Sequence, residues 1–336
     1  MSSIKTAIVI LNWNGEGFLK KFLPGVIQYS KSIATVFVAD NASNDGSIAY
    51  LNSLGEDVKI IQFDDNYGFT GGYNRALKQI DAEYFVLLNS DVEVSSGWIQ
   101  PIIDLMDNNK EVGICQPKIK GYHQPTHFEY AGACGGFIDW LGYPFCRGRL
   151  FNSIEEDLHQ YKNPIEVFWA TGACMFIRSN LYNKLNGLDE YFFAHMEEID
   201  LCWRAQLIGQ KIMVVPSSEV YHVGGGTLPK NNPRKTYYNF RNNLMMLYKN
   251  LPGNKLWIVI IIRLVLDGVA GLKFMLDGDL KDTFAVLKAH LDFYKSLING
   301  NVKRDNSSKK TPTTVYQKSI LWAYYIKGIR NYQSLK

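Results

Sequence analysis

The sequence predicts an α/β fold in which helices cover a mainly parallel sheet. Through the first ninety residues, apolar runs of strand length alternate with amphipathic stretches of helix length, which is the pattern of βαβ units. The chain has 336 residues, of which 46% are hydrophobic, so it can bury a full core as one or two domains. Polar residues follow each apolar run. Because ligands of such sheets bind beyond the carboxyl ends of the strands, we expect a ligand site along that edge.

The individual elements follow in chain order. Strands are predicted at Thr6–Leu11, Thr35–Ala39, Val58–Phe63 and Tyr84–Leu88, and helices near Gly17–Ser30, Ser47–Leu54 and Gly71–Ile80. Beyond them, the segment from Tyr130 to Gly148 is rich in glycine and aromatic residues, and we expect a loop beside the sheet. Its aromatic rings would pack either against a sugar or as a small hydrophobic cluster.

The C-terminal quarter of the chain is basic. Residues 1–248 carry a net charge of −5, and residues 249–336 carry +9. We therefore predict an α/β domain over 1–248, with its two halves meeting near residue 110, and a basic amphipathic helical region over 249–336. Helices are expected near Leu256–Leu276, Thr283–Ile298 and Tyr316–Tyr332, with a polar basic tract at Asn301–Thr311 between the last two.

The first of these helices resembles a membrane span in its hydropathy. It contains Arg263, Asp267 and Lys273, and each charge would cost about 2.5–3.5 kcal/mol at a bilayer centre. An amphipathic or buried helix is therefore expected. Basic segments favour anionic surfaces, either nucleic acid or membrane; for the helices, packing or dimerisation is the alternative to membrane contact.

Cysteine usage and the N-terminus indicate a cytoplasmic protein. The five cysteines are odd in number and have no C-x-x-C spacing, so neither a disulfide framework nor a zinc knuckle is predicted. The first apolar run is too short for a signal peptide.

Candidate site residues stand where the first two strands end. Asn12 and Asn14 follow the first strand, and Asp40 ends the second. A carboxylate there can accept hydrogen bonds from the edge of a base or from a sugar hydroxyl. By contrast, Asp45 and Ser47 are expected to form only a turn and a helix cap.

The next two strands end in a glycine-rich loop and an acidic tip. In Asp64–Arg75, glycines let the backbone approach a ligand and the following helix N-terminus favours negative charge. No Gly-Lys-Ser/Thr or G-x-G-x-x-G motif is present, so NTPase and dinucleotide functions are poorly supported. After the fourth strand, Asp91 is a candidate ligand for Mg²⁺ or Mn²⁺ bound to a diphosphate.

The segment Thr171–Thr227 combines small residues, acids and a histidine. Thr171 and Gly172 would let a sugar approach closely. In Glu197-Glu198-Ile199-Asp200, successive side chains on a helix point about 100° apart, so the three acids cannot all face one ligand. Asp200 and Arg204 are expected to form an i,i+4 ion pair. His222 precedes a run of glycines, Gly224–Gly226, and is a candidate second metal ligand.

These motifs, taken together, resemble the non-processive inverting glycosyltransferases of family 2, in particular their rhamnosyltransferase-like group. The resemblance spans about two thirds of the chain and rests on these segments in order: Ala7–Gly15, Val38–Ser47, Asn66–Phe69, Asn89–Asp91, Thr171–Met175, Gly187–Phe193, Glu197–Arg204 and His222–Gly225. It implies the GT-A fold, with a nucleotide-binding half at about 1–110 and an acceptor half at about 111–248.

The resemblance also implies roles for individual residues. Asp40 would contact the base, Asn66 and Arg75 would help to hold the nucleotide, and Asp91 would be the last acid of the metal-binding D-x-D motif, whose first position is Asn89 here. Glu198 would be the general base in place of the usual aspartate, with Glu197 as the alternative, and His222 would complete the Mg²⁺ or Mn²⁺ site. The full predicted nucleotide-sugar set is Asn12, Asn14, Asp40, Asn66, Gly68, Arg75, Asn89, Ser90, Asp91, Thr171 and Gly172; Trp203, Arg234, Lys235 and Arg241 are candidates for the diphosphate or the acceptor.

The predicted function is transfer of one sugar, with dTDP-rhamnose as the leading donor, to a hydroxyl of a cell-surface glycan carried on a lipid. No Q-x-x-R-W motif follows Glu198, so a processive synthase is not expected. The predicted partners are the donor, a glycan acceptor and the inner, anionic face of the cytoplasmic membrane, with a homo-oligomer as an alternative use of the C-terminal helices; no nucleic acid is expected. A nucleotidyltransferase-like enzyme and a non-catalytic carbohydrate-binding subunit are the other two hypotheses.

Overall fold

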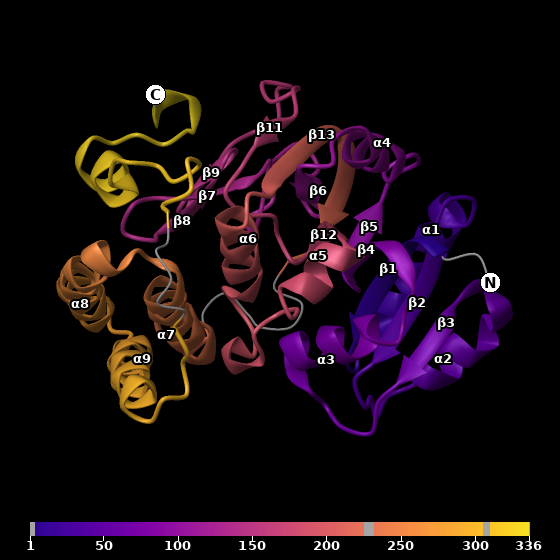
Figure 1. The fold of residues 1–336 in the computed structure, drawn as a ribbon, viewed down its shortest axis with the longest axis horizontal. Helices are drawn as coiled ribbons and strands as arrows, with labels where there is room; N and C mark the ends of the chain where they lie inside the picture. Colours follow the sequence, from indigo (N-terminus) through magenta and orange to yellow (C-terminus); the bar gives the residue numbers. More distant parts are fainter. Residues whose placement is uncertain (1–3, 225–231, 305–309, 336) are drawn as a thin grey trace.

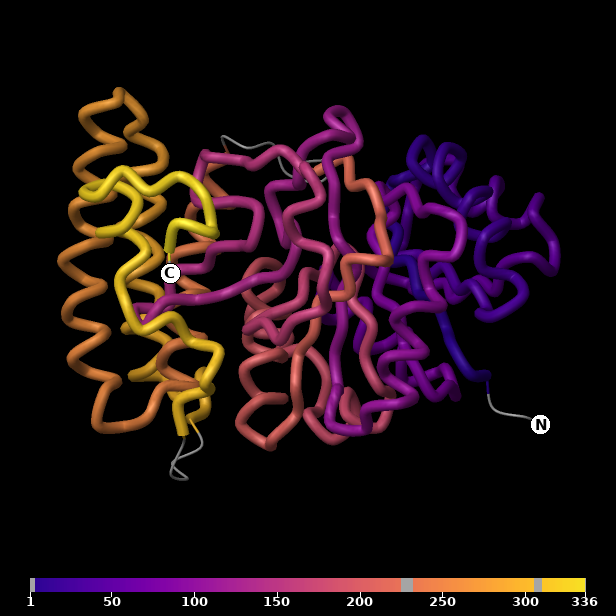
Figure 2. Tube along the Cα trace, turned by 90° about the horizontal axis from the view of Figure 1, so that it is seen from above, coloured from indigo at the N-terminus to yellow at the C-terminus, as the bar shows by residue number. Residues whose placement is uncertain are grey.

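The computed structural model describes residues 4–224, 232–304 and 310–335, and within them a long mixed sheet is covered by helices (Figure 1). Its strand order is β11-β13-β6-β12-β4-β1-β2-β3, with β5 paired to the far end of β13. The N-terminal half of the sheet lies at one end of the molecule and the C-terminal helices lie at the other (Figure 2).

The N-terminal half consists of parallel strands joined by helices. The strands are β1 (Ile4–Asn12), β2 (Thr35–Asp40), β3 (Lys59–Gln62) and β4 (Ala82–Asn89), and the connecting helices are α1 (Glu16–Ser30), α2 (Ser47–Ser53) and α3 (Gly68–Leu77), with a short 3₁₀ turn η1 (Gly55–Asp57). Ala7, Val9 and Ile8 of β1 are fully buried, because helices cover both faces of the sheet. The predicted alternation of strands and helices is confirmed.

The second half of the sheet is mixed. Its elements are β5 (Val92–Val94), α4 (Gln100–Asn108), β6 (Val112–Gly121), β11 (Ile165–Glu166), β12 (Cys174–Arg178), α5 (Ser179–Lys184), η2 (Glu190–Phe192), α6 (Glu197–Leu207) and β13 (Lys211–His222). Strand β12 runs antiparallel to both β4 and β6, whereas β13 runs parallel to β6. At its end, β13 pairs with β5 so that His222 faces Val92. This pairing brings the late histidine beside the acidic tip of β4.

The segment from Tyr130 to Gly148 is not the predicted loop. It contains β7 (Gly136–Ile138) and β8 (Pro144–Cys146), which continue into β9 (Arg149–Leu150) and β10 (Ser153–Ile154) as a separate antiparallel sheet. Phe137 stacks on Phe145 with ring centroids 5.7 Å apart, and also on Tyr332 of the C-terminal tail at 5.2 Å. These aromatic side chains therefore form a hydrophobic cluster, one of the two alternatives that the sequence left open.

The C-terminal region begins with three helices: α7 (Pro233–Asn250), α8 (Gly253–Leu276) and α9 (Leu280–Ile298). Helix α7 lies against α6, and α8 and α9 form the outer edge (Figures 1 and 2). The predicted boundary after Tyr248 falls in the last turn of α7 and stays a prediction. No helix in the described ranges has the length and hydropathy needed to cross a bilayer.

The prediction of a helix near Tyr316–Tyr332 is wrong. The tail contains a five-residue π-helix, η3 (Trp322–Ile326), and a final 3₁₀ turn, η4 (Gln333–Leu335). Before η3, backbone amides of the tail bond to the small sheet: Tyr316 donates to the carbonyl of Ile138 and Ile320 to the carboxylate of Asp139. Donors used in this way cannot form a helical ladder. Of the predicted basic tract Asn301–Thr311, residues 305–309 lie outside the described residues.

Candidate active site

The ends of β1 and β2 are joined by a polar network around Asp40. Its side chain is fully buried and accepts hydrogen bonds from Nδ2 of Asn12 at 2.9 Å and from the amide of Ser43 at 2.9 Å. Asn14 accepts from the amide of Asn44 at 2.8 Å. Oδ1 of Asn12 is buried and has no partner among the described residues, so it is an unsatisfied acceptor at the strand end. The predicted contact of Asp40 with a base stays a prediction.

The glycine-rich loop before α3 is held by Asn41. Its Nδ2 donates to Oδ1 of Asn66 at 2.9 Å and to the carbonyl of Gly68 at 3.0 Å, and its Oδ1 accepts from the amide of Tyr67. Gly68 has a φ of +69°, and a methyl group there would meet the ring of Phe193, so only glycine fits. This loop therefore has one fixed conformation.

Arg75 of α3 is the predicted cation beside this loop. Its guanidinium lies over the ring of Tyr67, 3.9 Å from the ring centroid. It also forms an ion pair with Glu190 of η2 at 3.1 Å. The pair is solvent-exposed and weak, so Arg75 stays a candidate for an incoming anion.

Asp91, His222 and Glu129 form the central cluster at the sheet edge. Nε2 of His222 lies 3.2 Å from Oδ1 of Asp91, and Nδ1 lies 3.6 Å from Oε2 of Glu129. All three side chains are buried. Burial alone would lower the pKa of His222, but the interactions with the two carboxylates outweigh it and raise the pKa to about 10. Without a metal, the two carboxylates therefore favour the protonated form of the ring.

The Asp91–His222 pair fits one divalent cation. A carboxylate oxygen of Asp91 and an imidazole nitrogen of His222 lie 3.2 Å apart, and Mn²⁺ would accept donors of both kinds. Metal binding would displace the proton of His222. Within residues 4–224, 232–304 and 310–335, no three His, Cys, Asp or Glu side chains are arranged as a complete set of ligands. Substrate phosphates would have to supply the rest.

The Thr171–Ala173 turn connects this cluster to α6. The amide of Asn89, at the end of β4, donates to the carbonyl of Ala173 at 3.0 Å, which places Asn89 and Ser90 beside the turn. Thr171 is buried and caps the turn by accepting from the amide of Ala173. A methyl group at Gly172 would lie 3.2 Å from the ring of Phe69 and 4.0 Å from Cβ of Glu198. Gly172 thus lies beside the predicted base.

The acids Glu197 and Glu198 begin helix α6. Glu197 is 5% exposed, whereas Glu198 is half-buried. One carboxylate oxygen of each is buried and has no partner in the described part of the chain. Burial raises the pKa of Glu198 to about 7; burial and the neighbouring charge of Glu198 raise that of Glu197 well above its usual range. Of the two, Glu198 combines access with a pKa near neutrality, as a general base requires.

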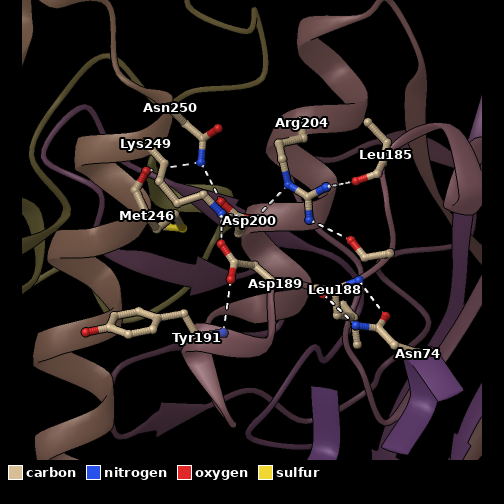
Figure 3. Close-up of polar contacts among 11 residues, drawn as sticks. Asn74, Leu185, Leu188, Asp189, Tyr191, Asp200, Arg204, Met246, Lys249 and Asn250 are labelled. Carbon is tan, nitrogen blue, oxygen red and sulfur yellow. Dashed lines mark hydrogen bonds and ion pairs between the residues drawn. The ribbon is translucent and has the colours of Figure 1, made fainter. Parts of the chain in front are cut away.

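Asp200 has a structural role. It is fully buried and accepts from Arg204 at 2.7 Å, Lys249 at 2.9 Å and Asn250 at 2.7 Å (Figure 3). Lys249 also pairs with Asp189 at 2.6 Å. Burial alone would raise the pKa of Asp200, but the charges of Arg204 and Lys249 hold it below its usual value. The predicted Asp200–Arg204 pair is present within α6, and the contacts of Asp200 with Lys249 and Asn250 join α6 to α7 in the interior.

The loop between η2 and α6 is held by Asn242 of α7. Nδ2 of Asn242 donates to the carbonyls of Phe192, Ala194 and His195 at 3.0, 2.8 and 2.8 Å. His195 and Met196 have φ values of 70° and 73°, which cost energy in non-glycine residues. Asn242 therefore stabilises the strained backbone that immediately precedes the two acids.

The remaining candidates are distributed over α6 and α7. Trp203 is 1% exposed and packs on Phe168, so the prediction that it contacts diphosphate or acceptor is wrong: it is a core residue. Arg241 donates to the carbonyls of Tyr191 and Phe192 and supports the same loop as Asn242.

Arg234 and Lys235 lie at the start of α7. Arg234 is exposed, and Lys235 is close enough to His195 to help burial lower its pKa to about 4. The predicted glycines at positions 225 and 226 lie outside the described residues.

Three residues of the site were not predicted. Asn41 lies within the segment Val38–Ser47, but nothing in that segment predicts its contacts. Glu129 precedes a glycine-rich segment, which gives no sign of a histidine contact nearly a hundred residues later. Asn242 sits on an ordinary amphipathic helix. The contacts of a buried amide or acid can be recognised only once the structure places its neighbours.

Comparison with known proteins shows the family of the chain. The family model described as "Glycosyl transferase family 2" matches residues 7–185, a range that ends before α6. An N-acetylglucosaminyl-diphospho-decaprenol L-rhamnosyltransferase of Mycobacterium tuberculosis is 25% identical over 231 residues, covering 64% of this chain and 75% of the relative. A low-salt glycan biosynthesis hexosyltransferase of Haloferax volcanii is 24% identical over 60% of this chain and 61% of the relative.

Solved structures show the same fold. S. aureus TarS in complex with UDP-GlcNAc has a TM-score of 0.58 at 16% identity, covering 87% of this chain and 81% of that one. A mannosyltransferase of Pyrobaculum calidifontis, in complex with GDP-Man and Mn²⁺, has a TM-score of 0.53 at 11% identity, covering 90% and 80%. The GT-A fold is thereby confirmed, and the chain belongs to glycosyltransferase family 2.

Proposed function

We propose that this glycosyltransferase moves one sugar from a nucleoside diphosphate sugar to a hydroxyl group with inversion at the anomeric carbon. The observation that carries the proposal is the position of Glu198: it stands beside Gly172, and the same turn is hydrogen-bonded to the end of β4 that leads to Asp91. Glu198, whose pKa is raised to about 7, and the candidate metal site of Asp91 and His222 thus lie on either side of the Thr171–Ala173 turn.

In the proposed mechanism, Glu198 accepts the proton of the acceptor hydroxyl as that oxygen attacks the anomeric carbon. Asp91 and His222 would hold Mg²⁺ or Mn²⁺, which when bound neutralises negative charge on the departing diphosphate. Arg234 and Lys235 are the basic residues proposed to assist at the diphosphate, since Arg241 already bonds to backbone carbonyls. A single displacement of this kind inverts the configuration.

The nucleotide would bind along the ends of β1, β2 and β4. Asn12, Asn14, Asp40, Asn66, Gly68, Arg75, Asn89 and Ser90 supply the proposed contacts. The unsatisfied Oδ1 of Asn12 and the fixed loop at Gly68 favour this assignment.

We propose dTDP-rhamnose as the donor and a lipid-linked glycan as the acceptor. The M. tuberculosis relative is named as a rhamnosyltransferase acting on a diphospho-decaprenol carrier, which supports both choices. A lipid-linked acceptor would place the enzyme at the inner face of the cytoplasmic membrane.

The test is a screen of nucleotide sugars for release of nucleoside diphosphate with and without Mn²⁺. We expect one donor to be turned over, nucleoside diphosphate rather than pyrophosphate to be released, and Asp91→Asn to lose most of this activity. Asp104→Asn, an exposed acid of α4, is the matched control and should behave like the wild type. Pyrophosphate release would instead identify a nucleotidyltransferase.

A further inference from the structure

Helix α8 exposes an apolar stripe on its outer side. Trp257, Ile261, Leu264, Leu272 and Met275 recur at helical spacing, and each is at least 45% exposed. Helix α9 continues the surface with Leu280, Phe284, Leu287 and Leu291, each at least 54% exposed. Monomeric soluble proteins rarely expose contiguous apolar area on this scale. We call these two stripes, with Trp322, Tyr325 and Ile326 of η3, the outer apolar face.

The inner side of the same helices is fixed to the protein by a polar network. Asp267 of α8 is fully buried and pairs with Arg263, and it also contacts Tyr143 at 3.1 Å and His290 of α9 at 3.1 Å. Leaving any of these buried charges unpaired would be costly, so α8 cannot rotate to bury its outer stripe. The polar network therefore holds the helices with the outer apolar face directed away from the rest of the described chain.

Basic side chains surround the outer apolar face. The exposed lysines of α8, α9 and η3's C-cap are Lys255, Lys273, Lys281, Lys288, Lys295 and Lys327; Lys273 pairs with Asp277 and Lys288 with Asp292, and the other four leave an excess of positive charge. Lys273 and Tyr325 lie close enough for each to influence the pKa of the other, which places η3 next to α8. Residues 249–336 carry a net charge of +9. This combination of an apolar face, aromatic residues and a basic rim is that of helices that lie in a membrane interface.

We propose that the outer apolar face docks onto the surface of an anionic lipid bilayer, with α8 and α9 lying in the plane of the interface. A second copy of the chain is a poorer occupant, because two surfaces with the same strong positive charge repel each other. Anionic headgroups attract that charge, and apolar side chains of such helices enter the headgroup boundary by about 5–10 Å. The inference deepens the proposed function, which places the enzyme at a membrane, by assigning the surface that docks there; its evidence comes from residues outside the catalytic site.

Vesicle binding of the whole chain tests this proposal. The protein is sedimented with phosphatidylcholine vesicles and with vesicles that contain about one third phosphatidylglycerol. We expect binding to the anionic vesicles at least tenfold tighter than to the neutral ones, and weaker binding as salt is raised. The variant Ile261→Ser/Leu264→Ser/Leu287→Ser should lose at least tenfold in affinity. Leu158→Ser, at an exposed leucine distant in sequence, is the matched control and should bind like the wild type.

Fluorescence adds a second measurement that does not depend on the triple variant. Brominated lipids should quench tryptophan emission, and Trp257→Phe/Trp322→Phe should remove most of that quenching. Failure to bind either vesicle, or equal binding to both, would overturn the proposal. So would a dimer that forms without vesicles and dissociates in the triple variant, because the occupant would then be a second copy. None of these outcomes depends on transferase activity, so the proposed function is tested separately.

Discussion

Nε2 of His222 lies 3.2 Å from the carboxylate of Asp91, while the opposite ring nitrogen faces Glu129 at 3.6 Å. Metal-binding histidines usually have a carboxylate or carbonyl on the ring nitrogen that does not bind the metal, and that partner fixes the ring orientation. Glu129 lies on this side of the ring at 3.6 Å, longer than a hydrogen bond, and a small rotation of the ring on metal binding would bring the two into contact. Glu129 also accepts a hydrogen bond from the amide of Ala131, so its own carboxylate is held in place.

Glu129→Gln should therefore weaken metal binding without removing a ligand. We expect a loss of about 10–100-fold in Mn²⁺ affinity, the usual effect of removing such a partner, measured by titration calorimetry on the donor-bound protein. Glu93→Gln, at an exposed acid of β5, serves as the control. Unchanged Mn²⁺ affinity in Glu129→Gln would show that Glu129 does not orient His222.

Asn242→Ala should impair catalysis through the loop that it holds. Three carbonyls would lose their donor, and the strained backbone before Glu197 would relax. A displacement of about 1 Å of a catalytic group can cost about a hundredfold in rate, so we expect kcat to fall by about 10–100-fold with donor affinity unchanged. Steady-state kinetics and donor titration separate the two quantities. Asn108→Ala, at the exposed end of α4, should affect neither; equal losses of kcat and donor affinity in Asn242→Ala would contradict a positioning role.

Asp200→Ala should destabilise the fold. The substitution removes the buried carboxylate that Arg204 and Lys249 share, and breaking such a pair costs about 3 kcal/mol. Urea denaturation at neutral pH measures this loss. Because the pKa of Asp200 is lowered in the folded state, its contribution is present above the pKa of the unfolded chain and is lost as pH falls through the lower folded value.

The control for Asp200 is the exposed i,i+4 pair of Lys273 and Asp277. Solvent screens such a pair, so Asp277→Ala should leave the free energy of unfolding nearly unchanged. Equal effects of the two substitutions would show that the buried network around Asp200 is not what stabilises the junction of α6 and α7.

The pH dependence of transfer should report the ionisation of Glu198. The base must be a carboxylate, and burial raises its pKa to about 7, so kcat should rise with pH and level off above about 7. Rates are measured at saturating donor and metal. In Glu198→Asp, whose carboxylate is one methylene farther from the acceptor, the residual rate should also rise with pH. A rate that falls as pH rises through this range would show that the titrating group acts as an acid.

The βαβ half and the chemistry at its strand ends follow closely from the sequence. Alternating apolar runs of strand and helix length leave little choice of topology there, and a strand such as β1 is buried on both faces by the helices it requires. Asp91 and His222 were paired by their family pattern, and the β5–β13 register confirms that they are neighbours.

Other features depend on long-range packing that a sequence pattern does not reveal. The tail near Tyr316 looked helical, but its amides bond to the small sheet instead. Trp203 looked available to a ligand, yet its ring packs in the core. In α8 both sides are apolar, so only the buried Arg263–Asp267 pair shows which side faces inward.

The most direct test of the account compares Glu198→Gln with Glu197→Gln in transfer and in donor binding. Glutamine keeps the shape of either side chain but cannot accept a proton from the acceptor. We expect Glu198→Gln to lose about 10²–10⁴-fold in transfer rate with unchanged donor affinity. Glu197→Gln should keep more transfer activity than Glu198→Gln. Full transfer by Glu198→Gln, or a greater loss in Glu197→Gln, would contradict the assignment of Glu198 as the base.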